Sequence, residues 1–201
     1  MQITTEAALR AIYGEPMEIA AAKEIDHLDR HCRRWFELSP FALIATSDGA
    51  KLDVSPKGDA PGLCKVEDDK HLLVPDWPGN NRIDGLTNIV RHPHVGLLSL
   101  IPNVKETLRV NGVASIHDDE PLRALFETKG RLPITVLRIA VEEVFLHCSR
   151  SFLRARMWAP ESWPQRDELP SMGEMIRDHS RKDVPQLTPD ELDRRYADRL
   201  Y

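Results

Sequence analysis

The feature that most constrains this chain is a series of short apolar segments between residues 41 and 148. The longest, residues 134–148, alternates apolar and polar side chains, as a strand with one buried face does. Turn-forming residues such as Asp48-Gly49 separate the segments, and no long helical pattern stands between them. A parallel sheet needs a long helix between successive strands, so the pattern predicts an antiparallel sheet that closes into a barrel.

We therefore expect a mainly β fold with flanking helices, built on a six-stranded antiparallel β-barrel. The predicted strands are residues 41–46, 52–55, 71–75, 95–101, 107–116 and 134–148. The predicted helices are residues 5–12, 21–38, 81–90 and 119–128, with two further helix starts at the capping boxes Ser171–Glu174 and Thr188–Glu191.

This pattern predicts one domain over residues 1–201, because 201 residues suit a single domain with extensions. Its expected parts are a helical N-terminal extension (1–39), the barrel (40–150) and an irregular-to-helical tail (151–201).

Charge and cysteine usage narrow the class of protein. The net charge is -5 and the pI is near 5.9, which argues against a nucleic-acid partner. Three widely spaced cysteines make a disulfide framework improbable and favour a reducing compartment. The first residues lack the basic start and apolar run of a signal peptide, and the apolar runs are too short to span a membrane. We expect a cytoplasmic protein without a membrane segment.

The stretch PDWPGNNRIDGLTNI, residues 75–89, carries the clearest indication of a ligand. A strand ends at Pro75, and the spacing predicts a helix that begins near Asn81, with Asn81 as its cap. Arg82 in a first helical turn opposes the helix dipole, which makes sense if an anion such as a phosphate lies in front of it. The same pattern is compatible with a surface arginine on an ordinary capped helix.

Two further stretches carry polar side chains suited to a ligand. Ser55 and Lys57 follow a predicted strand and could neutralise a phosphate together with Arg82, although a hairpin rim with a solvated lysine fits as well. In ETLRVNG, residues 106–112, alternation places three polar side chains on one strand face. Such a face suits a flat heteroaromatic ring, and equally a solvated strand face.

In this order, the stretches resemble the pyridoxamine 5'-phosphate oxidase-like family of FMN-binding split barrels, and especially one bacterial subgroup. The resemblance covers roughly residues 30–160. The motifs that carry it are Val54-Ser-Pro-Lys57, Val74-Pro-Asp76 with Asn81-Arg82, Asn88 to Leu98, and Thr107-Leu-Arg-Val-Asn-Gly112.

The resemblance implies a split barrel that binds FMN, mainly through residues 52–112. The residues that would hold the FMN phosphate are Ser55, Lys57, Asn81 and Arg82. Those that would line its ring are Val54, Pro75, Asp76 and Thr107. The family also implies a homodimer with FMN at the subunit interface, and the residues expected to reach it from the second subunit are Arg150, Arg154, Arg156 and Trp158.

The resemblance does not extend to every feature of the family's vitamin B6 oxidase. That enzyme carries an arginine–histidine pair in its C-terminal segment that reads the substrate phosphate, and the tail FLRARMWAPESWPQRDELP does not reproduce it. The resemblance therefore implies an FMN-dependent oxidoreductase whose small-molecule substrate the sequence does not identify, and it does not carry over the oxidation of pyridoxamine phosphate.

Three alternatives remain open at this point. A non-catalytic flavin carrier or sensor would use the same residues. A haem or a deazaflavin could bind to the same barrel, with His27, His31 or His147 as haem ligands. His27 and His31 have a spacing that also suits zinc, but no second cluster completes four ligands, so no metal is expected.

Overall fold

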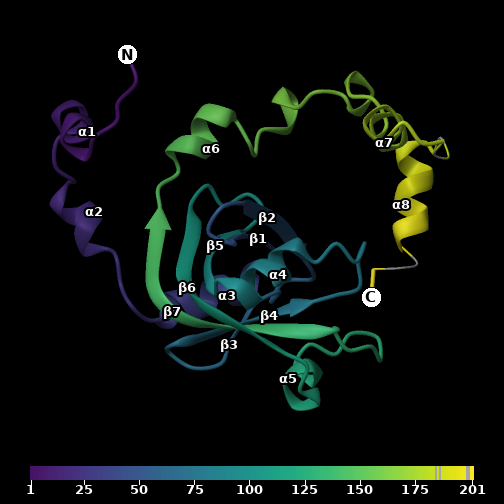
Figure 1. Ribbon diagram of the computed structural model, residues 1–201, viewed down its shortest axis with the longest axis horizontal. Coiled ribbons are helices and arrows are strands. Elements are labelled where there is room, and N and C mark those ends of the chain that lie inside the picture. The colour runs from purple at the N-terminus through teal and green to yellow at the C-terminus, as the bar shows by residue number, and fades with distance from the viewer. Residues whose placement is uncertain (184, 186, 198–199) are drawn as a thin grey trace.

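The computed structural model describes residues 1–183, 185, 187–197 and 200–201. Its centre is one antiparallel sheet of seven strands in the order β2-β1-β5-β6-β7-β4-β3, which curls around the core as a split barrel (Figure 1). The strands are β1 (Phe41–Ser47), β2 (Leu52–Gly58), β3 (Lys65–Val66), β4 (His71–Asp76), β5 (His94–Leu100), β6 (Thr107–His117) and β7 (Thr135–His147). The mainly β architecture is confirmed, and the extra strand β3 is a two-residue partner of β4.

Strand β7 joins the two halves of the sheet. It pairs with β6 along its length and also with β4 at its N-terminal end. The β6–β7 ladder shifts register between Asn111 and Gly112, and a bulge of this kind bends a strand. A Cβ on Gly112 would lie 2.1 Å from the Ala140 carbonyl oxygen, so only glycine fits this position.

The core lies inside the curled sheet and is closed by α3 (Arg30–Leu38) and α4 (Asp84–Arg91). Phe36 of α3 is buried among strand residues such as Leu97 and Val110. Alternating residues of each strand supply this core, as period-two burial requires.

The helix predicted over residues 21–38 is wrong in extent. The structure has α2 (Glu18–Ala22), then an extended segment in which Ile25 forms a β-bridge with Val144, and then α3. The Asp29 side chain accepts hydrogen bonds from the N–H groups of His31 and Cys32, so a new helix begins there.

The predicted start of the helix near Asn81 is also wrong. Helix α4 begins at Asp84, after Ile83 in the left-handed conformation. Asn81 is left-handed as well, and the Asn80 side chain accepts a hydrogen bond from the Arg82 N–H, so these residues form a turn before the helix.

The terminal segments extend beside the barrel as two arms (Figure 1). The helices of these arms have no buried residue among those described. The predicted capping boxes at Ser171 and Thr188 are present. The remaining helical elements are α1 (Glu6–Tyr13), α5 (Glu120–Ala124), α6 (Arg150–Ala155), η1 (Pro160–Ser162), η2 (Arg166–Glu168), α7 (Met172–Ser180) and α8 (Pro189–Ala197). No helix in the described part of the chain is long and apolar enough to cross a membrane.

Candidate functional site

A cavity of about 640 Å³ opens between β1, β2, the end of β4 and the start of α4. Cavities of this size hold small molecules and cofactors in other proteins. Its walls combine apolar side chains of the core with charged side chains at the rim. Its lining residues are Ile44, Thr46, Asp53, Ser55, Pro56, Lys57, Gly58, Leu63, Pro75, Asp76, Trp77, Gly79, Asn80, Asn81, Arg82, Ile83, Asp84, Gly85, Leu86, Ile89, Ile134 and Leu137.

The fold brings most of the predicted site residues to this one cavity, although they come from two separate stretches of the sequence. The six that line it are Ser55, Lys57, Pro75, Asp76, Asn81 and Arg82. The curling of the sheet explains the convergence, because four strands separate β2 from β4 in the sheet order and yet the Lys57 and Asp76 side chains meet, with α4 packed against β2.

Alternation along β2 decides which of its side chains reach the cavity. Asp53, Ser55 and Lys57 line the cavity, whereas Val54 projects from the other face of the sheet and is 61% exposed. The Ser55 hydroxyl donates a hydrogen bond of 2.7 Å to Asp53 Oδ2. Val54 therefore does not line this cavity, although a ligand shared between two subunits could still contact it.

The cavity rim carries two cations that are paired with carboxylates. Arg82 donates to Asp84 Oδ2 from Nε at 2.8 Å and lies within 2.7 Å of it through Nη2. Lys57 forms an ion pair with Asp76, and both side chains are largely buried. Within the described residues, no hydrogen bond uses the backbone N–H groups that begin α4, those of residues 84–86. These free N–H groups and the two cations can together accept an anion.

Sequence reasoning missed most of the apolar lining and also three residues that shape the polar side of the cavity, Asp53, Thr46 and Gly85. Asp53 shares the face of Ser55, so strict alternation along the strand would have found it. Thr46 is buried on β1 and accepts a hydrogen bond from Asn88 Nδ2 at 3.1 Å, and no local pattern predicts this contact. A Cβ on Gly85 would lie 2.9 Å from Asp53 Oδ2, so this glycine lets α4 approach β2.

The other predicted residues lie away from the cavity within a single chain. Thr107 is buried on β6 opposite His147. Trp158 donates its indole N–H to the Val104 carbonyl oxygen at 2.8 Å, and Arg150 is exposed at the start of α6. The contribution of Arg150 and Trp158 to a shared ligand stays a prediction about a second subunit, and the contact of Thr107 with the flavin ring stays a prediction about its own chain.

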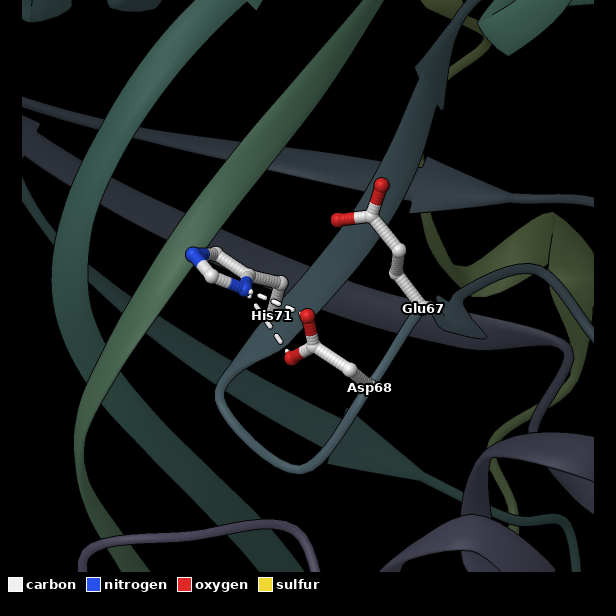
Figure 2. Close-up of side chains that lie close together, drawn as sticks. All are labelled: Glu67, Asp68 and His71. Atoms are coloured by element: carbon white, nitrogen blue, oxygen red, sulfur yellow. Dashed lines mark hydrogen bonds and ion pairs between the residues drawn. The ribbon is translucent and has the colours of Figure 1, made fainter.

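A separate group of possible metal ligands lies at the β3–β4 hairpin. Figure 2 shows His71 Nδ1 hydrogen-bonded to both oxygens of Asp68, at 2.9 Å each, with Glu67 beside them. Glu67 is ion-paired with Arg138 of β7 at 2.6 Å, and His71 is paired with Asp68. These ion pairs explain why the three side chains lie close together. The group is outside the cavity lining.

The fold and the cavity define a split barrel with one polar-rimmed site between strand ends and a helix start. The pyridoxamine 5'-phosphate oxidase family model matches residues 28–148, and the chain belongs to this family. That segment contains the whole sheet and every residue that lines the cavity. The membership predicted from the motifs is therefore confirmed.

Several solved structures are similar to this chain over its barrel. The HupZ protein of Group A Streptococcus is 20% identical, with a TM-score of 0.48, over 59% of this chain and 92% of that chain. General Stress Protein 26 of Bacillus anthracis is 16% identical, with a TM-score of 0.44, over 58% and 94%. An FAD-binding protein of Mesorhizobium loti is 15% identical, with a TM-score of 0.40, over 60% and 94%. No curated protein matches the chain.

Proposed function

We propose that this chain is an FMN-binding flavoprotein that acts as an oxidoreductase on a small molecule. The observation that carries the proposal is the convergence of six residues, predicted from separate stretches, on one cavity beside unpaired N–H groups of α4. Membership in a family that is named for an oxidase supports the redox part of the proposal.

The cavity fits FMN in size and in the chemistry of its hydrogen-bond donors. A volume of about 640 Å³ is within the range of cofactor sites. Lys57 and Arg82 can contact a phosphate, as can the Ser55 hydroxyl. Lys57 is ion-paired with Asp76, and Arg82 with Asp84. A bound phosphate must therefore replace a carboxylate as the partner of each cation.

In this proposal the charged rim holds the phosphate and the apolar walls hold the ring. Ser55, Lys57, Asn81 and Arg82 would bind the phosphate, while Pro75 and Asp76 would line the ring. The bound flavin supplies the hydride chemistry, and the protein supplies binding, orientation and exclusion of water.

We also propose that the protein is a homodimer that shares the cofactor between subunits. The outer face of β1, β2 and β5, opposite the cavity, carries exposed or half-buried apolar side chains that lie next to one another in the ladder. This outer sheet face comprises Leu43, Ala45, Leu52, Val54 and Leu98. A contiguous apolar surface is typical of a subunit interface. Through it, Val54, Arg150 and Trp158 would reach a cofactor bound to the second subunit.

The same proposal includes a single domain over residues 1–201 and a cytoplasmic location. The domain has the parts described above, an N-terminal extension, a barrel and a tail. A non-catalytic flavin carrier or sensor is the alternative, since it would use the same cavity.

The proposal is tested on the purified full-length protein by its visible spectrum and by mass spectrometry of the released cofactor. We expect flavin absorbance, or its appearance on titration with FMN, and oxidation or reduction of the flavin by a substrate from a panel. A protein that takes up no FMN would refute the proposal. Uptake without turnover on any substrate or nicotinamide donor would instead support the carrier alternative.

A further inference from the structure

Beside the cavity, hydrogen bonds and an aromatic contact join three residues that are far apart in the chain, Asp59, Trp77 and Tyr201. The Asp59 carboxylate accepts two side-chain hydrogen bonds, one on each oxygen, and its Oδ1 also accepts the Ala60 backbone N–H at 2.7 Å. The Trp77 indole N–H donates to Oδ2 at 2.9 Å, and the Tyr201 hydroxyl donates to Oδ1 at 2.6 Å. The two rings meet edge to face, with their centroids 4.8 Å apart and an interplanar angle of 79°. We call these three residues the Asp59 clasp.

The clasp is attached to the rest of the barrel at several points. Arg131 donates a hydrogen bond to the Tyr201 backbone oxygen, and Lys129 Nζ lies 5.7 Å from the centre of the Tyr201 ring. The Asp59 N–H donates to the Pro40 carbonyl oxygen at 3.0 Å. Figure 1 shows the C end of the chain next to the segment that connects β4 to α4, where Trp77 lies.

Of the clasp residues, Trp77 is the one that lines the cavity. Its indole is oriented by Asp59 on one edge and by the Tyr201 ring against it. The shared hydrogen bond raises the pKa of the Tyr201 phenol, because the Asp59 carboxylate holds the phenolic proton. The phenol therefore stays a donor at neutral pH, and the clasp is intact where the protein would function.

We propose that Tyr201 is a positioning residue for the candidate site, which through Asp59 holds the Trp77 indole against the cavity and slows release of the bound ligand. The inference rests on the proposed function, because it takes the ligand to be FMN. Without Tyr201, Asp59 would keep only the Trp77 indole and the backbone N–H of its neighbour Ala60 as donors, and the Trp77 ring would lose its edge-to-face neighbour. Water and a departing ligand would then pass this wall of the cavity more easily.

The test compares Tyr201→Ala and Tyr201→Phe in the full chain with Tyr13→Ala, which changes an exposed tyrosine of α1. FMN dissociation is followed by recovery of flavin fluorescence after dilution. We expect Tyr201→Ala to release FMN about tenfold faster, the effect of losing a charge-assisted hydrogen bond and an aromatic contact. Tyr201→Phe should fall between this variant and the wild type, and Tyr13→Ala should match the wild type. Release from Tyr201→Ala at the wild-type rate would overturn the inference.

A second readout does not depend on the flavin. The indole N–H of Trp77 gives its own resonance in a ¹H–¹⁵N spectrum, which Trp77→Phe identifies. We expect Tyr201→Ala to shift this resonance and to speed its exchange with water, while the melting temperature of the protein stays close to that of the wild type. An unchanged resonance would refute the positioning role, even if the wild type binds no FMN. Failure of the wild type to bind FMN, with a shifted resonance, would refute the proposed function and leave the orientation of Trp77 by Tyr201 established.

Discussion

At the scale of single residues, the candidate site depends on two cations, each of which is ion-paired with a carboxylate that a bound phosphate would replace. Lys57 is paired with Asp76 and Arg82 with Asp84, and each cation lies at the rim of the cavity. The sequence indicated the two cations, because a lysine past a strand and an arginine before a helix are both suited to a phosphate. It did not indicate their carboxylate partners, because these contacts depend on how the loops fold.

Removal of either cation should weaken FMN binding. We expect Lys57→Ala and Arg82→Ala each to cost about 1.5–3 kcal/mol of binding free energy, the range for hydrogen bonds to charged groups. Quenching of flavin fluorescence in a titration measures the change. Lys51→Ala, in the exposed turn between β1 and β2, is the matched control and should bind as the wild type does. Unchanged affinity in both cavity variants would show that the phosphate lies elsewhere.

The three cysteines should differ in reactivity. Burial raises the pKa of the Cys32 thiol and of the Cys64 thiol, each to about 12. The backbone N–H of Arg150 instead lowers the pKa of Cys148, which is exposed. A thiol reagent attacks the thiolate, so Cys148 should react first, at a rate that reaches its plateau at lower pH than a free cysteine does. A Cys148→Ser variant that still reacts quickly in the folded state would contradict this.

At the scale of elements, the β6–β7 ladder sets the curvature that forms the cavity. The bulge at Asn111/Gly112 bends the sheet, and β7 then pairs with β4 to bring Asp76 to the cavity. The sequence predicted both strands from their alternation. It did not predict the bulge, because a register shift depends on the contact between two strands and not on either one alone.

Substitution of Gly112 should destabilise the sheet. In Gly112→Ala the added Cβ meets the Ala140 carbonyl oxygen, a contact that only backbone movement can relieve. We expect a loss of about 3 kcal/mol or more in the free energy of unfolding, at the upper end for overpacked sites. Urea unfolding followed by tryptophan fluorescence and by circular dichroism measures it, and the proposed single domain should unfold in one transition by both probes.

The matched control for this experiment is Gly79→Ala. No heavy atom of the residues that the structure describes lies within 4 Å of the position of its Cβ, so the stability of this variant should stay close to that of the wild type. Equal stability of Gly112→Ala and Gly79→Ala would show that the bulge accommodates a side chain.

At the scale of the whole molecule, the outer sheet face and the two terminal arms offer apolar surface that the barrel does not bury. Leu52 is 81% exposed at the edge strand β2, and the arm helices have no buried residue among those described. An edge strand with apolar side chains is a surface that a protein normally covers. This is the structural support for the proposed homodimer.

Charges on this face should separate the subunits. We expect the double variant Leu52→Lys/Val54→Lys to be monomeric and to bind FMN more weakly, since the second subunit would no longer reach the cofactor. Sedimentation equilibrium gives the mass and a flavin titration gives the affinity. Leu125→Lys, at the end of α5, is the control and should leave both unchanged. A wild-type protein that is monomeric at micromolar concentration would contradict the proposed dimer.

The sequence by itself determined the type of fold, the places of the strands and the motifs of the family. These depend on period-two alternation and on short motifs, which are local properties of the chain. The tertiary structure decided that Asn88 of α4 reaches Thr46 of β1, that the helix at the cavity begins at Asp84, and that Tyr201 lies against Trp77. These facts depend on register, on turn conformation and on contacts between residues far apart in the chain, which no local pattern encodes.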